Sequence, residues 1–261
     1  MRSISAQQFG TIRIPVPPVE VQREIVRILD HFTELEAELE AELEARRLQY
    51  HHYAEQLLQS QGDVPRMRMG DAANIVRGAS PRPIQAFMTQ DPEGIPWIKI
   101  GDVPNDGKYI TRTAQRVSAA GASKSRRVHP GDFVLSNSMS FGRPYISKIE
   151  GCIHDGWLAI SDFSQHFVPD YLYYLLRSSS IQAEFARRAG AGTVKNLNAD
   201  IVKSVVVPVP PRQRQVQVVE LLDHFDTILS DLSFGLPAEL TARRRQYEYY
   251  RDKLLTFEEK R

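Results

Sequence analysis

Apolar residues recur at alternating intervals of three and four positions in two separate stretches of the chain. The first stretch carries Ile25, Ile28, Phe32, Leu35 and Leu39, and the second carries Val218, Leu221, Phe225, Ile228 and Leu232. This spacing places apolar side chains along one side of an α-helix, as in the seam of a coiled coil. The pattern predicts two long helices, over residues 20–60 and 212–261.

The two stretches are copies of one sequence unit. Residues 12–32 return as residues 205–225 at a constant offset of 193, and in both copies a Pro-x-Pro-Pro run ends an extended segment before the helix begins. Further along, the offset becomes 197, because four residues have been inserted. The insertion brings Gly235 and Pro237, so we expect a kink or an interruption in the second helix.

A lone helix with such a seam would expose an apolar stripe to water, so each helix needs a partner. The other copy is the most economical partner. Both helices attach to the segment between them, and we therefore expect them to pack side by side and antiparallel. For the seam residues themselves, a purely structural role is expected.

The segment between the helices has short β-rich runs separated by Gly, Pro, Asn and Asp. We expect strands at 97–100, 133–136, 145–149 and 158–160. Helices are expected at 171–176, capped by Asp170, and from a capping box at Ser179 and Gln182 to Ala189-Gly190, with a short turn capped by Asn198. The expected fold class is α+β, with one mixed α/β domain over residues 61–211 flanked by two long helices that form an antiparallel coiled coil.

Residues 1–19 are interpreted as the tail of a second, missing domain followed by a Pro-rich strand. Residues 2–11 align weakly with residues 195–204, where the central domain ends.

Positive charge is concentrated in the middle of a nearly neutral chain. Residues 66–204 contain 18 Lys and Arg against 12 Asp and Glu, whereas the flanks contain 15 against 20. This asymmetry suits an anionic partner for the central domain. A single cysteine excludes an internal disulfide, and no apolar run is long enough for a membrane span, so a cytoplasmic protein is expected.

The sequence has no motif for catalysis. Methyltransferase signatures, a Walker A loop, His/Cys metal spacing and a Gly-x-Ser-x-Gly elbow are all missing. Asp102, Asp132 and Asp155 are interpreted as turn residues. No catalytic residue, cofactor or metal site is therefore expected.

The remaining candidate chemistry is a binding surface for DNA. Lys124, Arg126 and Arg127 lie together in a Ser/Gly/Ala-rich run that we expect to be a loop able to follow phosphates. Asn137 and Ser138, close to Arg143, offer groups of the kind that bind base edges. The full set of candidate DNA-binding residues is Arg77, Lys99, Lys124, Arg126, Arg127, Asn137, Ser138, Arg143, Arg187, Arg188, Lys195 and Asn196.

The repeated segments resemble the specificity (S) subunit of type I restriction-modification systems. The resemblance rests on the two Pro-x-Pro-Pro-x-x-x-Gln runs, the Ala-Arg-Arg-x-Gln-Tyr-x-x-Tyr runs at 45–53 and 242–250, and segments 95–103, 130–143 and 192–201 of the central domain. It covers nearly the whole chain. Family members usually carry two target recognition domains, whereas this chain has one and looks like a half-sized S subunit.

The resemblance implies recognition of a DNA half-site without catalysis, docking of methyltransferase (M) subunits and, through them, restriction (R) subunits. Residues implied in setting the helical rod and docking M subunits are Gln22, Arg46, Arg47, Tyr50, Tyr53, Gln215, Arg243, Arg244, Tyr247 and Tyr250. Two chains are expected to associate as a homodimer on a palindromic split site. Two alternatives are a nuclease or methyltransferase in its own right, which the missing motifs disfavour, and a coiled-coil adaptor that binds proteins without direct DNA readout.

Overall fold

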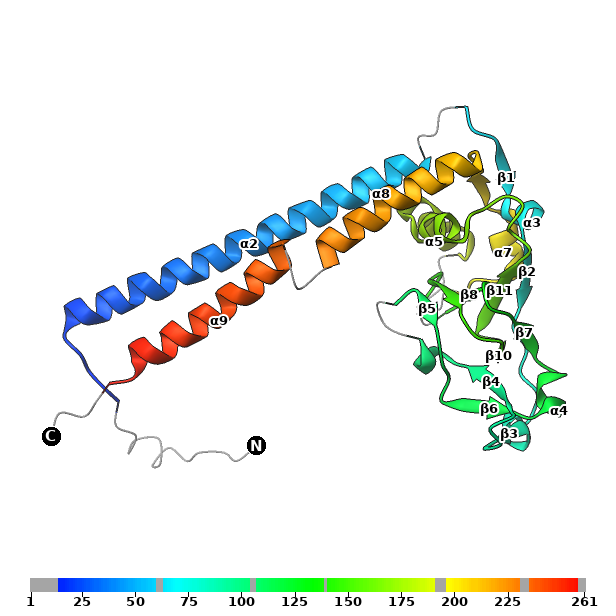
Figure 1. Cartoon of the computed structure of the whole chain (residues 1–261), viewed down its shortest axis with the longest axis horizontal. Helices are drawn as coiled ribbons and strands as arrows, with labels where there is room; N and C mark the ends of the chain where they lie inside the picture. Colours follow the sequence, from blue (N-terminus) through cyan, green and yellow to red (C-terminus); the bar gives the residue numbers. More distant parts are fainter. Residues whose placement is uncertain are drawn as a thin grey trace. The chain divides into compact units, whose positions relative to one another are not determined.

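The computed structural model describes residues 14–59, 63–103, 107–138, 140–190, 196–230 and 235–257 (Figure 1). The chain divides into two compact units. We call residues up to Tyr50 together with those from His224 onward the helical unit, and residues His51–Asp223 the central domain.

The described part of the helical unit is built from three helices of the two copies of the repeat. Helix α2 spans Val19–Gln59, and the second copy forms α8 (Arg212–Ser230) and α9 (Gly235–Leu255). The end of α2 and the start of α8 belong to the central domain. Gly235 has a backbone φ of +75°, which glycine adopts without the strain that a side chain would add. The expected interruption of the second helix at the four-residue insertion is thus confirmed.

Aromatic and charged contacts show that the helices pair antiparallel. The ring of Phe32 stacks on Tyr250 at 5.5 Å, and the ring of Tyr50 lies 6.1 Å from Phe225. Because the early part of α2 contacts the late part of α9, and its later part contacts α8, the two copies run in opposite directions. The expected antiparallel pairing is confirmed.

Two five-stranded sheets form the central domain, with the strand orders β2-β11-β8-β9-β5 and β3-β6-β4-β10-β7. The first sheet contains β2 (Asn74–Arg77), β5 (Tyr109–Ile110), β8 (Phe133–Ser136), β9 (Pro144–Ser147) and β11 (Trp157–Ser161). The second contains β3 (Met88–Thr89), β4 (Ile95–Ile98), β6 (Gln115–Val117), β7 (Arg126–Val128) and β10 (Gly151–Ile153). Both sheets are mixed, because β5 pairs with β9 and β4 with β10 in parallel while the other pairs are antiparallel.

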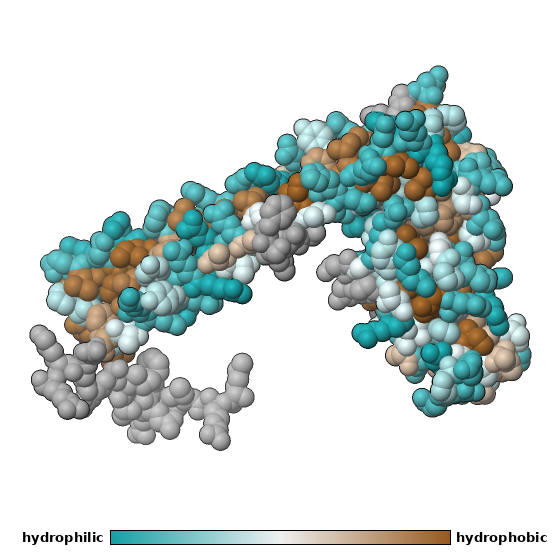
Figure 2. Space-filling view, in the orientation of Figure 1, coloured by the Kyte–Doolittle hydropathy of each residue, from teal (hydrophilic) through white to brown (hydrophobic). Residues whose placement is uncertain are grey.

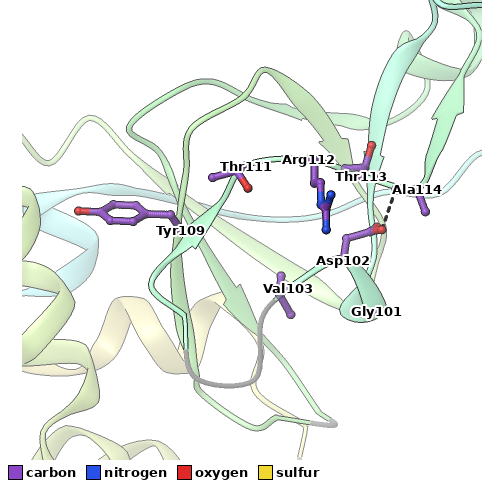
Figure 3. A pocket seen from close by; sticks show the side chains of 8 residues that line it. All are labelled: Gly101, Asp102, Val103, Tyr109, Thr111, Arg112, Thr113 and Ala114. Carbon is purple, nitrogen blue, oxygen red and sulfur yellow. Dashed lines mark hydrogen bonds between the residues drawn. The ribbon is translucent and has the colours of Figure 1, made fainter. Parts of the chain in front are cut away.

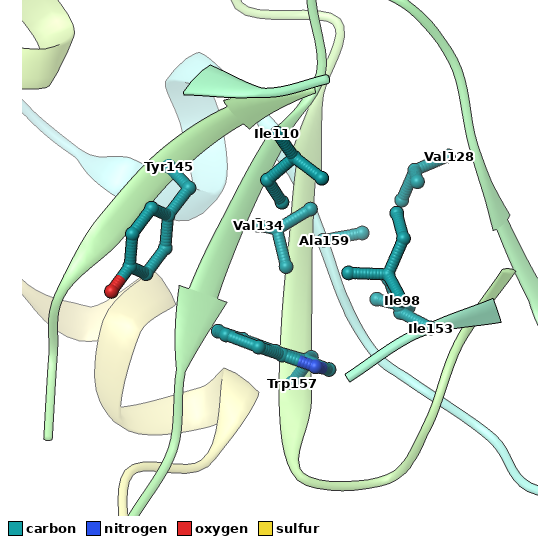
Figure 4. Close-up of a cluster of buried hydrophobic side chains, with 8 residues drawn as sticks. All are labelled: Ile98, Ile110, Val128, Val134, Tyr145, Ile153, Trp157 and Ala159. Atoms are coloured by element: carbon teal, nitrogen blue, oxygen red, sulfur yellow. The ribbon is translucent and has the colours of Figure 1, made fainter. Parts of the chain in front are cut away.

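The two sheets share one hydrophobic core (Figure 4). Ile98, Val128 and Ile153 come from the second sheet, and Val134 and Trp157 come from the first. All five of these side chains are fully buried. The chain passes from one sheet to the other through the turn at residues 154–156, which joins β10 to β11. Because Ile153 and Trp157 on either side belong to the core, this turn lies beside the core.

Short elements complete the domain. A small antiparallel ladder joins β1 (Arg66–Arg68) to β12 (Val206–Pro208), the extended segment of the second repeat. The remaining helices are α3 (Met69–Ala72), α4 (Ala119–Ala122), α5 (Pro169–Arg177), α6 (Ser179–Arg188) and α7 (Ala199–Ser204), with 3-10 turns η1 (Ile84–Phe87) and η2 (Ile100–Asp102).

Three local expectations were wrong. The residue before α5 is Val168, and Asp170 lies inside the helix, where its carboxylate pairs with Lys108. Ser178, and not Ser179, caps α6 through a hydrogen bond from the Ile181 amide. The run that contains Lys124, Arg126 and Arg127 was expected to be a flexible loop, but it includes α4 and strand β7. Strand β7 forms at the edge of its sheet by pairing with β10.

Candidate nucleic-acid interface

The turn at residues 154–156 is fixed against the end of strand β2. Gly78 and Ala79 donate their backbone amides to the carbonyls of Trp157 (2.8 Å) and Ile153 (3.2 Å). A Cβ atom at Gly78 would lie 2.0 Å from the His154 carbonyl oxygen, so only glycine allows this approach. The segment after β2 therefore holds both ends of the turn, at the last residue of β10 and the first residue of β11.

Asp155 connects this turn to two neighbouring segments through its backbone carbonyl and its carboxylate. The Asp155 carbonyl accepts hydrogen bonds from Arg77 Nε and from Asn137 Nδ2, both at 3.0 Å. Its carboxylate accepts a hydrogen bond from Ser80 Oγ at 2.9 Å and lies 3.8 Å from a guanidinium nitrogen of Arg82. The bond from Ser80 lowers the pKa of Asp155, so the carboxylate is ionised at neutral pH.

Arg126 joins the same group from strand β7. Its Nε donates to the Arg77 carbonyl at 3.4 Å. We call Arg77, Ser80, Arg82, Arg126, Asn137 and Asp155 the Asp155 cluster. Arg77, Arg82 and Arg126 are exposed, so the cluster combines three arginines with one carboxylate, of which Arg82 lies at ion-pair distance.

His154 and Lys99 lie beside the Asp155 cluster. His154 packs against the rings of Trp97 and Trp157, and its Nδ1 accepts a hydrogen bond from the Gly156 amide at 2.9 Å. Burial lowers the pKa of His154, and the positive charge of Lys99 lowers it further. His154 is thus a neutral, structural residue of the turn.

The loop after β8 brings together another part of the predicted set. Asn137 is only 4% exposed, and its carbonyl accepts from the Leu197 amide at 2.8 Å, which places the neighbouring, exposed Asn196 near this loop. Ser138 is half-buried in the loop, and the Arg143 guanidinium lies over the Tyr145 ring. Because the amide of Asn137 is already engaged by Asp155, its clearest role is to hold the turn.

The other predicted DNA-binding residues are dispersed. Lys124 Nζ lies 4.8 Å from the Phe87 ring centroid, and Arg127 pairs with Glu150 at 3.0 Å. Arg126 and Arg127 separate because consecutive residues of a strand face opposite sides. Arg187 and Arg188 both pair with Glu184, and Lys195 lies outside the described residues.

Sequence reasoning missed Arg82 and the central position of Asp155. Arg82 lies between two prolines, which marks a loop but says nothing about what the loop faces. Asp155 was expected to be a turn residue, and it does lie in a turn, but its contacts with distant segments were not predicted. Its partners at 77, 80 and 137 are 18 to 78 positions away in sequence, so no local spacing indicates them.

The residues predicted to set the rod differ in their surroundings. Gln215 is 1% exposed, and its side chain accepts from the Val168 amide while donating to the carbonyls of His166 and Pro210. Its repeat partner Gln22 is exposed and donates to the Pro17 carbonyl.

Further along the helices, the tyrosines and arginines of the set divide in a similar way. Tyr50, Tyr247 and Tyr250 contact phenylalanines of the opposite copy, and Arg244 pairs with Glu36 and Glu40 of α2. Arg46, Arg47 and Arg243 pair with glutamates of their own helix, and Tyr53 is 47% exposed.

An open pocket of about 620 Å³ lies beside strand β5 (Figure 3). Tyr109, Thr111, Arg112 and Thr113 line one side, and the Asp102 carboxylate accepts from the Ala114 amide at 2.9 Å. Asp102 thereby acts as the turn residue that the sequence predicted. Within the described ranges, no group of three metal-ligating side chains occurs and no helix is long and apolar enough to cross a membrane.

Comparison with known proteins gives a consistent set of relatives. A family model described as the type I restriction modification DNA specificity domain matches residues 1–45 and 62–242. The specificity subunit of the type I restriction enzyme EcoR124I/EcoR124II from Escherichia coli is 31% identical over 263 residues, a match that covers 95% of this chain and 64% of that protein. This chain therefore spans less than two thirds of that relative's length.

Two further similarities bear on length and fold. A putative type I specificity subunit of Mycoplasma pneumoniae is 24% identical over 272 residues, which cover 97% of this chain and 99% of that protein. The crystal structure of the HsdS subunit from Thermoanaerobacter tengcongensis superimposes with a TM-score of 0.64 and 20% identity, over 98% of this chain and 63% of that one. The fold of this chain is thus shared with a solved HsdS subunit.

Proposed function

Because this chain belongs to the family of type I restriction-modification DNA specificity domains, we propose that it recognises the DNA sequence for a type I restriction-modification complex. The Asp155 cluster carries this proposal, since it gathers three exposed arginines at one hydrogen-bonded turn. Methyl transfer and cleavage would belong to M and R subunits, so this chain needs neither a catalytic residue nor a cofactor. The protein-only adaptor is not favoured, because the relatives are specificity subunits.

Recognition divides into positioning and selection. Arg82 and Arg126 would contact phosphates, which fix the register of a protein on the duplex without reading its sequence. Polar groups near the turn would select base pairs, each good bidentate pair contributing about 1–3 kcal/mol of discrimination. The other predicted DNA-binding residues would contact the flanking DNA; they are Lys124, Arg127, Ser138, Arg143, Arg187, Arg188, Lys195 and Asn196.

A double variant tests the phosphate contacts. Arg82→Ala with Arg126→Ala should weaken binding to all duplexes alike, and the slope of log affinity against log salt should flatten by about 1.8, or about 0.9 for each lost phosphate contact. Binding is measured for the chain with its M subunits over a salt series. Arg177→Ala is the matched control, because that guanidinium lies against the Tyr173 ring in α5.

The result separates a DNA reader from an adaptor. An unchanged salt slope in the double variant would show that the Asp155 cluster does not contact the DNA backbone. A wild-type complex that binds every duplex equally, and that directs no methylation to a defined sequence in cells, would contradict DNA recognition itself.

Helices α2, α8 and α9 would dock the M subunits and hold two chains together. Exposed Arg46, Arg47, Tyr53 and Arg243 are available for M subunits, whereas the buried or interhelical residues Tyr50, Gln215, Arg244, Tyr247 and Tyr250 would set the rod. We further propose a homodimer, in which two identical domains face the two halves of a palindromic split site. The support for this is an apolar face of the first repeat copy that is open to solvent.

A further inference from the structure

A carboxylate in the middle of a cationic DNA-binding surface requires an explanation. Phosphates and carboxylates repel each other, so an acid at this position lowers affinity for any duplex. The Asp155 carboxylate nevertheless lies beside Arg82, and the Asp155 carbonyl holds Arg77, whose own carbonyl accepts from Arg126. The arrangement suits a surface on which Asp155 lowers the affinity for every duplex and raises the selectivity for one DNA sequence.

The Asp155 turn fixes one arginine in a particular orientation. The Arg77 guanidinium donates through Nε to the Asp155 carbonyl at 3.0 Å, and its backbone carbonyl accepts from Arg126. Among the described residues, no group hydrogen-bonds the two terminal nitrogens of Arg77. An arginine anchored by Nε presents these nitrogens as a preformed fork that matches two adjacent acceptors.

The second anchor of the turn is Ser80. Its hydroxyl donates to the Asp155 carboxylate at 2.9 Å, and the Asp155 amide donates back to Ser80 Oγ at 3.4 Å. Asn137 holds the same carbonyl oxygen as Arg77, at 3.0 Å, from the loop after β8. Two segments of the domain, the end of β2 and the loop after β8, thus converge on Asp155, which limits how far the Arg77 fork can move.

We propose that Arg77 reads a base edge with two neighbouring acceptors, of the kind that guanine presents in the major groove, and that Asp155 is its positioning residue. The negative charge of Asp155 disfavours a phosphate beside the fork, so the fork engages uncharged base acceptors. Arg82 and Arg126 remain the backbone contacts. This inference rests on the proposed DNA-recognition function and assigns its specificity to one turn.

The first experiment changes the fork. The target is found by mapping methylated positions in DNA from cells that carry the chain and its M subunits, and binding of the complex to single-base-pair variants of that target is then measured. Arg77→Lys keeps the charge but loses the fork. It should lower target affinity roughly 5- to 150-fold, the range expected for a bidentate pair, and relax selection at one base pair only.

The second experiment changes the positioning residue. Asp155→Asn removes the charge but keeps an acceptor for Ser80. Binding to non-target duplexes should strengthen and its salt dependence should steepen, while the ratio of target to non-target affinity falls at least about fivefold, the low end of one base contact. A purely structural residue would not strengthen non-target binding.

Further variants separate the possible failures. Ser80→Ala keeps the charge and loosens the turn, so it should lower selectivity at the same base pair without strengthening non-target binding. Arg177→Ala should change neither quantity, and melting curves show whether each variant is folded. The inference is wrong if Arg77→Lys keeps full selectivity, or if Asp155→Asn leaves both affinities unchanged. DNA recognition by the chain still stands in that case, provided that the wild-type complex discriminates between duplexes.

Discussion

Glutamine occupies the matched positions 22 and 215 of the repeat, yet only one of the two is buried. Gln215 makes three hydrogen bonds to the backbone at residues 166, 168 and 210, and these join the start of α8 to the loop before α5. Gln22 makes one, to Pro17. A buried amide whose donors and acceptor are all used holds its neighbours more firmly than an exposed one.

Replacing Gln215 by alanine should destabilise the central domain. The change leaves the Val168 amide and the carbonyls of His166 and Pro210 without these partners, at a cost of about 1–3 kcal/mol. Thermal or urea unfolding of the whole chain measures the loss, and faster hydrogen exchange at Val168 localises it. Gln22→Ala is the matched control and should change stability by less than about 0.5 kcal/mol. Equal losses in the two variants would contradict the assigned role of Gln215.

At the scale of elements, the pairing of α2 with α9 depends on both apolar and charged contacts. Arg244 reaches across to Glu36 and Glu40, whereas its neighbour Arg243 pairs with Glu239 of the same helix. The two ion pairs of Arg244 join the two copies of the repeat. The pairs are exposed, and their effect should depend on salt.

Arg244→Ala should lower the melting temperature of the helical unit more than Arg243→Ala does at low salt. Only the first variant removes an attraction between helices, because Arg243 acts within α9. The difference should nearly vanish at about 1 M salt, where the screening length is about 3 Å. Circular dichroism melts of both variants at the two salt concentrations provide the measurement. A difference that persists at high salt would point to lost packing instead of lost charge.

The elements also show how far sequence patterns reach. The seam spacing placed α2 within one residue of its ends, and β8 was predicted at its observed bounds. Strand β7 was mistaken for a loop, because three residues with two adjacent arginines carry no β pattern. Its strand conformation comes from pairing with β10, which is more than 20 positions away.

At the scale of the whole molecule, equivalent positions of the repeat differ in exposure. Val207, Val219 and Leu58 are at most 8% exposed, whereas their counterparts Ile14, Val26 and Leu255 are 73%, 56% and 52% exposed. Apolar surface is visible where α2 begins and α9 ends (Figure 2). Exposed apolar residues thus gather where the first copy begins and the second copy ends, whereas their repeat counterparts are covered.

We propose that a second copy of the chain covers these exposed residues, and Val26→Asp tests the proposal. Light scattering at micromolar concentration should give twice 29.7 kDa for the wild-type chain and a single chain mass for the variant, because burying the new carboxylate is costly. Leu48→Asp is the matched control, since Leu48 is 63% exposed but lies about 33 Å further along α2 than Val26. A wild-type chain that is monomeric both alone and with M subunits would exclude the homodimer.

The sequence by itself determined the repeat, the two antiparallel helical copies, their interruption at Gly235 and the α+β class of the central domain. These features follow from periodic patterns and backbone preferences, which act between residues close in sequence. Only the tertiary structure decided that Asp155 gathers Arg77, Ser80, Arg82 and Asn137, and that Gln215 is buried while Gln22 is not. Such groupings depend on the turn that joins the two sheets, and contacts between distant segments leave no local periodicity in the chain.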